Sequence, residues 1–147
     1  MRTHQTISFN GLSYDLPMIA AALQNRSCKD LKRISDNIIK SNLPSWRVCR
    51  EESIDVPTSW DHIDIIEVVP GQASLKVYAG RLGYAKLQDL PIEPDAIIKP
   101  DQHKDLREYC INDLKTTKLL HDSILPRLKL REAMSEQYGV DLRSKSD

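Results

Sequence analysis

The sequence predicts an α/β protein. A strand-like segment at 5–10 precedes several helical segments, and a second strand-like segment at 62–69 precedes several more. Such alternation is typical of α/β domains, in which helices cover a sheet. The chain has 147 residues, which is enough for one domain with a hydrophobic core.

The first third of the chain is expected to hold one strand and two helices. QTISFN (5–10) reads as a strand that ends in a turn at Asn10-Gly11. A helix is expected over 16–26, because Asp15 and Pro17 suit the start of a helix. A second helix over 28–41 would bury an apolar face made of Leu31, Ile34, Ile38 and Ile39.

The remainder is expected to contain one more strand and three helices. Residues 42–60, with two prolines and two tryptophans, are expected to be irregular. HIDIIEVV (62–69) is apolar and β-branched, so a buried strand is expected there. The proline-rich segment 84–102 reads as a loop, and a polar tail occupies 140–147. Three helices are expected: 73–83 closed by Gly83, 101–122, and 126–138 ending at Gly139.

Composition excludes several classes of protein. Lys plus Arg number 21 and Asp plus Glu number 21, which argues against a strongly basic protein that coats nucleic acid. It leaves room for an enzyme that binds nucleic acid through a local groove and metal ions. The sequence has no apolar run of membrane-spanning length and no signal-peptide h-region.

The cysteine pattern predicts a reducing environment. Cys28, Cys49 and Cys110 are scattered and form no CxxC pair, which argues against a zinc ribbon or a disulfide framework. We therefore expect a cytoplasmic location, with buried and inert thiols.

Two residues on the expected helix 101–122 form a candidate chemical site. Tyr109 and Asp113 are four positions apart, so they share one face of the helix. A carboxylate binds a hard cation through oxygen, and a neighbouring phenol can hold an attacking water. The alternative is a helix with one half-buried tyrosine and a solvated aspartate.

The other candidate residues have structural alternatives of their own. Asp15 lies in FNGLSYDLPMI (9–19), where it is either a metal ligand or a helix N-cap. Asp64 is an acid at a strand end that can bond to backbone, and its role is left open. His62 is more simply a satisfied histidine than a ligand. Charges around Lys29 on the expected helix 28–41 form a solvated face.

Taken in order, these segments resemble the proofreading 3′–5′ exonuclease superfamily with the DEDD carboxylate set. FNGLSYDLPMI is similar to its second motif, and YCINDLKTT (109–117) is similar to its third motif in the tyrosine-bearing (DEDDy) form. HIDIIEVVPGQASLKVYAGRLG, LQDLP and REAMSEQYGVDLRSKSD are similar to the exonuclease region of phage and bacterial DNA-polymerase-like proteins. The resemblance covers nearly the whole chain and implies a ribonuclease-H-like fold.

The resemblance also implies roles for five residues. Asp15 and Asp113 would each bind a divalent metal, and Tyr109 would orient the nucleophilic water. Asn10 and Tyr14 would contact the terminal nucleotide. Two Mg²⁺ or Mn²⁺ ions roughly 3.5–4 Å apart would carry the hydrolysis of the phosphodiester bond.

The family's first motif, Asp-x-Glu on the first strand, has no counterpart in the sequence. The first acid in the chain is Asp15, so two of the four metal carboxylates are missing. We therefore expect an N-terminally truncated domain at 1–125, followed by a C-terminal helix and polar tail at 126–147. Metal binding and catalysis are expected to be weak or absent in the chain alone.

Three functions remain at this stage. The first is a 3′–5′ exonuclease segment acting on a single-stranded DNA 3′ end, with a partner chain supplying the Asp-x-Glu strand. The second is an inactive remnant that binds nucleic acid or a polymerase. The third is an unrelated helical regulatory domain. Exposed strand edges would also favour a homo-oligomer, and no membrane partner is expected.

Overall fold

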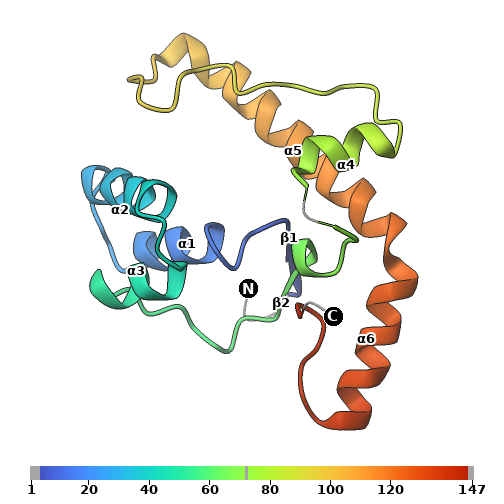
Figure 1. Ribbon diagram of the computed structural model, residues 1–147. Coiled ribbons are helices and arrows are strands. Elements are labelled where there is room, and N and C mark those ends of the chain that lie inside the picture. Colours follow the sequence, from blue (N-terminus) through green and yellow to red (C-terminus); the bar gives the residue numbers. More distant parts are fainter. Residues whose placement is uncertain (1–3, 72, 146–147) are drawn as a thin grey trace. The chain divides into compact units, whose positions relative to one another are not determined.

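The computed structural model describes residues 4–71 and 73–145, and it confirms a mixed α/β protein. Figure 1 shows its helices and strands in chain order. The chain forms two compact units, and each has its own elements. Unit 1 comprises Met1–Glu67 with Ser144–Asp147, and unit 2 comprises Val68–Arg143.

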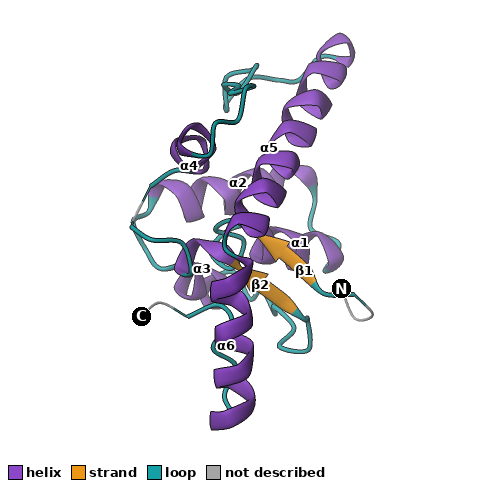
Figure 2. Ribbon diagram, turned by 90° about the vertical axis from the view of Figure 1, so that its right-hand side faces the viewer, coloured by secondary structure: helices purple, strands orange, loops and turns teal. Residues whose placement is uncertain are grey.

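Unit 1 is built on a pair of parallel strands, which Figure 2 shows side by side. β1 (Thr6–Ser8) pairs with β2 (His62–Asp64) in the register that places Thr6 opposite His62 and Ser8 opposite Asp64. The backbone N–H of Thr6 also donates to the carbonyl of Asp61 at 2.9 Å, and the Thr6 hydroxyl donates to the same carbonyl.

Three helices connect these strands: α1 (Asp15–Leu23), α2 (Cys28–Lys40) and α3 (Ser45–Glu51). Ser27 is the N-cap of helix α2. Its hydroxyl accepts the N–H of Asp30 at 3.2 Å and caps the first turn. The apolar faces of the helices meet in a cluster of buried residues: Ala20, Ala21, Ile34, Cys49 and Ile54. The expected apolar face of α2 is confirmed for Ile34, which is buried, and for Leu31 and Ile38, which pack against the cluster. It is wrong for Ile39, which is 63% exposed.

The expected strand 62–69 is wrong beyond Asp64. The Asp64 carboxylate accepts the N–H of Ile66 at 3.2 Å, and residues Ile65–Glu67 turn into the short 3₁₀ helix η1. A side chain that bonds to the backbone two residues later is typical of a turn and not of a ladder. The buried apolar residues after Asp64 therefore belong to a turn and not to a continued strand.

The expectation of irregular structure over 42–60 is wrong at α3. Pro44 occupies the N-cap position, where its fixed φ is compatible with a helix that starts at the next residue. Val48 and Cys49 are buried on the inner side of this helix.

Unit 2 is helical. It contains α4 (Leu75–Arg81), the 3₁₀ helix η2 (Pro100–Gln102), α5 (His103–Ser123) and α6 (Leu125–Tyr138). Helix α4 packs on α5. The expected loop over 84–102 is confirmed up to Lys99, the residue that precedes η2. Helix α6 ends at Gly139, whose φ of 67° is the left-handed conformation that glycine adopts easily.

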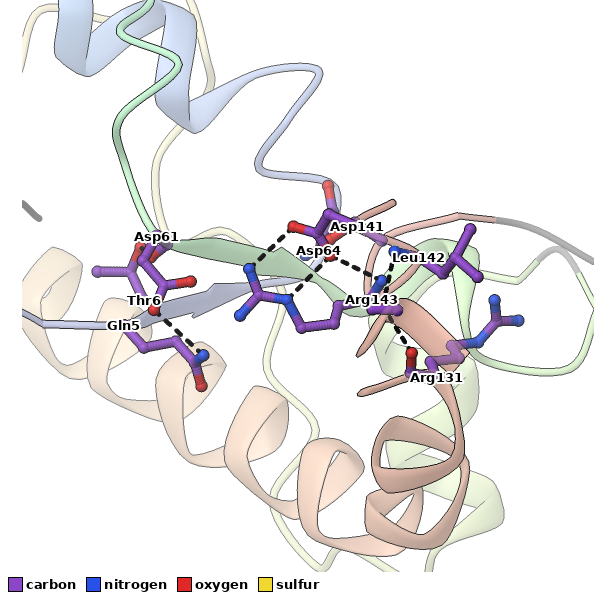
Figure 3. A network of polar contacts seen from close by, with 10 residues as sticks. Gln5, Thr6, Asp61, Asp64, Arg131, Asp141, Leu142 and Arg143 are labelled. Atoms are coloured by element: carbon purple, nitrogen blue, oxygen red, sulfur yellow. Dashed lines mark hydrogen bonds and ion pairs between the residues drawn. The ribbon is translucent and has the colours of Figure 1, made fainter. Parts of the chain in front are cut away.

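The end of unit 2 is held by a charge pair. The Arg143 guanidinium donates to both carboxylate oxygens of Asp141, at 2.9 and 2.8 Å (Figure 3). The last two residues of the expected polar tail lie outside the described residues. Among the residues that are described, none belongs to a helix long and apolar enough to cross a membrane.

Candidate functional site

The segment after β1 is held in place by a buried carboxylate. Asp64 at the end of β2 is 1% exposed. Its Oδ1 accepts the N–H of Asn10 at 2.7 Å, and its Oδ2 accepts the N–H of Leu12 at 2.9 Å. A buried carboxylate is stable when its oxygens accept such donors. The expected alternative for Asp64, an acid at a strand end bonded to backbone, is confirmed.

A second set of bonds, made by Ser8 of β1 and His62 of β2, fixes the same segment. The Ser8 hydroxyl accepts the N–H of Gly11 at 2.9 Å and contacts His62 Nε2 at 2.9 Å. Thr6 Oγ1 lies 2.9 Å from His62 Nδ1, so both ring nitrogens of His62 have hydroxyl partners. Burial lowers the pKa of His62, against the nearby charges of Asp64 and Asp15. The expected role of His62 as a satisfied histidine is therefore confirmed.

Gly11 is required by this close packing. A Cβ at this position would lie 2.0 Å from Ser8 Oγ and 2.5 Å from Ser8 Cβ. Asn10, immediately before it, has a φ of 67°, a conformation in which asparagine is among the most favoured non-glycine residues. The Asn10-Gly11 pair thus suits a turn that lifts the following residues off the strand.

Asn10 and Tyr14 line a cleft of about 510 Å³ in unit 1, here called the loop cleft. Tyr14 is fixed toward α2, because its hydroxyl lies 2.8 Å from Ser35 Oγ. The loop contributes Asn10, Ser13 and Tyr14, and the opposite wall contributes Ile38, Ile39, Leu43, Pro44 and Ser45. The two residues expected to contact a nucleotide are therefore brought together.

Asp15 is at the first helical position of α1 and is not its N-cap. Tyr14 takes the N-cap position, and it makes no side-chain capping bond. The expected alternative, Asp15 as N-cap, is wrong. Asp15 is exposed, yet partial desolvation of its carboxyl raises its pKa, and the negative charge of Asp64 raises it further. An acid whose ionised form is disfavoured by its surroundings is typical of a functional site.

Unit 2 brings Tyr109 and Asp113 together on α5, as the spacing predicts. Both are half-buried. Burial raises the pKa of Tyr109, and the charge of Asp113 and a hydrogen bond with Asp113 raise it further. The phenol therefore stays protonated and remains a hydrogen-bond donor.

A lysine on α4 belongs to the surroundings of this pair. Lys76 Nζ lies 2.6 Å from Asp89 Oδ1. The bond to Asp89 raises the pKa of Lys76, and the negative charge of Asp113 acts in the same direction. Asp89 and Tyr109 also line a small acidic cleft of about 180 Å³ with Asp105 and Glu108.

The described residues do not make a complete cation site. Within 4–71 and 73–145, no group of three or more His, Cys, Asp or Glu side chains is placed to hold a metal ion. Asp64 is the acid whose charge raises the pKa of Asp15. Both of its carboxylate oxygens already accept backbone N–H groups. The predicted site is also divided, because Asp15 lies in unit 1 whereas Tyr109 and Asp113 lie in unit 2.

Three features of the loop cleft and of the surroundings of Tyr109 and Asp113 were not predicted from the sequence. They are the anchoring of the loop by Asp64, the apolar wall of the loop cleft, and the Lys76–Asp89 pair. The thiols also differ from expectation, since Cys49 is buried but Cys28 and Cys110 are exposed. Comparison of the chain with family models, curated proteins and solved structures found no match.

Proposed function

We propose that this chain carries the second and third motifs of a DEDDy-type 3′–5′ exonuclease with a ribonuclease-H-like architecture. The observation that carries the proposal is the loop cleft, which Asn10 and Tyr14 line together with residues of α2, of the connection that follows it and of the start of α3. Asp15 follows Tyr14 directly in the sequence and would supply the carboxylate of the second motif. The substrate in this proposal is a single-stranded DNA 3′ end.

The cleft has the size and lining for a nucleotide. Its volume of about 510 Å³ is within the range of roughly 300–1,000 Å³ that is usual for small-molecule sites. Ile38, Leu43 and Pro44 offer an apolar wall for a base. Asn10 offers a side-chain amide that both donates and accepts hydrogen bonds.

Tyr109 and Asp113 supply the other half of the proposed chemistry. A protonated phenol donates a hydrogen bond to a water molecule, and the adjacent carboxylate is an oxygen ligand of the type that Mg²⁺ or Mn²⁺ prefers. Asp15 would contribute the second such ligand. Because the described residues hold no cation cage of their own, further carboxylates, such as those of an Asp-x-Glu strand, are needed for hydrolysis.

A second candidate function is binding without cleavage. The loop cleft lies wholly in unit 1 and needs no metal for binding, whereas hydrolysis needs residues of both units. A protein that only holds a DNA end or a polymerase would use the same cleft. The proposed location is cytoplasmic, in keeping with the three free thiols at Cys28, Cys49 and Cys110.

The proposal is tested by removing the Asn10 amide without disturbing its backbone. Asn10→Gly keeps the positive φ, and Asn25→Gly is the matched control because Asn25 has a φ of 60°. We expect a short oligonucleotide with a free 3′ end to shift the amide NMR signals of Ser13 and Tyr14. Asn10→Gly should weaken this binding about fivefold, the loss of roughly one hydrogen bond.

Asn25→Gly should bind as the unchanged chain does. Closed circular single-stranded DNA, which has no 3′ end, should leave these two amide signals unshifted. Equal shifts with circular DNA, or an unchanged affinity in Asn10→Gly, would contradict a site for the terminal nucleotide.

A further inference from the structure

We infer that the outer face of α3 is a second binding site for single-stranded nucleic acid, which holds the strand beyond its terminal nucleotide. This inference rests on the proposed function. It concerns four residues that line a cleft of about 350 Å³, here called the α3 cleft: Trp46, Arg47, Arg50 and Glu51.

The exposed tryptophan is the first observation. Trp46 is 64% exposed although α3 has a buried side, where Val48 and Cys49 lie. An indole left in water offers a large flat surface for stacking. A nucleic acid base is a partner for such a surface, since every base has an aromatic face.

The charges around Trp46 are the second observation. Arg50 is four residues after Trp46, so it lies on the same side of the helix. Arg47 Nε pairs with Glu51 Oε1 at 3.2 Å, whereas none of the ion pairs among the described residues involves Arg50. An unpaired guanidinium beside an exposed indole complements a phosphate beside a base.

The position along the chain is the third observation. Ser45 lines the loop cleft, and Trp46, the next residue, lines the α3 cleft. The two clefts are therefore adjacent in unit 1 at the start of α3. A strand whose terminal nucleotide occupies the loop cleft reaches Trp46 with the nucleotides that precede it.

The test uses closed circular oligo(dT), because a circle lacks the 3′ end that the loop cleft would hold. Fluorescence anisotropy of the labelled circle is measured with the full chain and with Trp46→Leu. We expect binding to be about tenfold weaker in Trp46→Leu, through the loss of one stacked base. Tyr138→Leu, a matched change at another exposed aromatic residue, should leave the affinity unchanged.

An abasic circle of the same length separates stacking from charge. The unchanged chain and Trp46→Leu should bind it equally, because no base is present to stack. Arg50→Gln should lower the slope of log affinity against log salt by about 0.7, the value for one single-strand phosphate contact. Arg127→Gln on α6 should not change the slope.

Three results would overturn the inference: equal binding of oligo(dT) by Trp46→Leu, an equal penalty on the abasic circle, or displacement of the circle by a polyglutamate peptide at matched charge. The last result would assign the α3 cleft to an acidic protein. If the circle fails to bind while Asn10→Gly still weakens a linear 3′ end, only the α3 cleft is refuted. If the circle binds through Trp46 while Asn10→Gly has no effect, only the terminal-nucleotide site is refuted.

Discussion

At the scale of single residues, Asp15 shows how one carboxylate makes the stability of unit 1 depend on pH. Its pKa is raised above the ordinary 3.8, first by desolvation and then by Asp64. The folded state therefore binds a proton more tightly than the unfolded state does. At a pH above both pKa values, ionised Asp15 lowers the free energy of unfolding, and this loss disappears as the pH falls through the raised pKa toward 3.8.

Asp15→Asn is accordingly expected to stabilise the chain at pH 7, with a gain that vanishes below pH 3.8. Urea denaturation at pH 7 and pH 3 measures this. Asp30→Asn is an opposite-sign control in the same unit, because a hydrogen bond from Ser27 lowers the pKa of Asp30. That variant should be less stable at pH 7 and unchanged in acid. A loss of stability in Asp15→Asn at pH 7 would show that the carboxylate serves the fold.

Gly11 gives the second prediction at this scale. Gly11→Ala would place a methyl group 2.0 Å from Ser8 Oγ, and moving Ser8 breaks its bonds to Gly11 and His62. We expect a loss of about 1–3 kcal/mol in the free energy of unfolding. Gly80→Ala in α4 is the control, since its nearest neighbour would be Leu87 Cδ1 at 3.9 Å, and it should be neutral or stabilising. Equal stability of the two variants would refute the close packing of the loop.

At the scale of elements, the helices were more predictable than the strands. Periodic apolar residues and terminal signals such as Gly139 act locally, so α2 and α6 lie close to their expected bounds. The end of β2 depends on Asp64, whose carboxylate bonds to Asn10 and Leu12 from a distant part of the chain. The bond between Asp64 and Ile66 is local, but no pattern within 62–69 indicates the two distant bonds that satisfy this carboxylate.

The candidate site also has one part that local sequence predicts and one part that depends on distant residues. The Tyr109–Asp113 pair follows from the helical repeat alone and was predicted from four residues of spacing. The loop cleft needs a wall from Ile38 to Ser45, which lies more than twenty residues beyond Tyr14. Helix α3 was hidden by Pro44, because a proline that ends one helix is equally suited to precede another.

At the scale of the whole molecule, catalysis would require contributions that the two units hold separately. Asp15 belongs to unit 1 and Asp113 to unit 2, and the sequence contains no Asp-x-Glu segment to add two further carboxylates. Two hydrated divalent cations are held weakly by two carboxylates. In the proposed function, binding of a nucleic acid end therefore needs unit 1 alone, whereas hydrolysis needs both units.

The last prediction follows from this division. The purified chain with Mg²⁺ is expected to release little or no nucleotide from a 5′-labelled single-stranded oligonucleotide. Supplying an Asp-x-Glu strand from a complete DEDDy exonuclease, as a fusion or a separate partner, should produce stepwise shortening from the 3′ end. In that protein Asp113→Asn should lower the rate at least about a hundredfold, by removing charge stabilisation at the reacting phosphate. Asp122→Asn, at the end of the same helix and paired with Lys118, is the control and should retain activity.

Metal-dependent shortening by the chain alone that Asp113→Asn abolishes would show that no partner strand is needed. If the supplemented chain binds DNA ends with the Asn10 dependence described above and still does not shorten them, the function is end binding without cleavage.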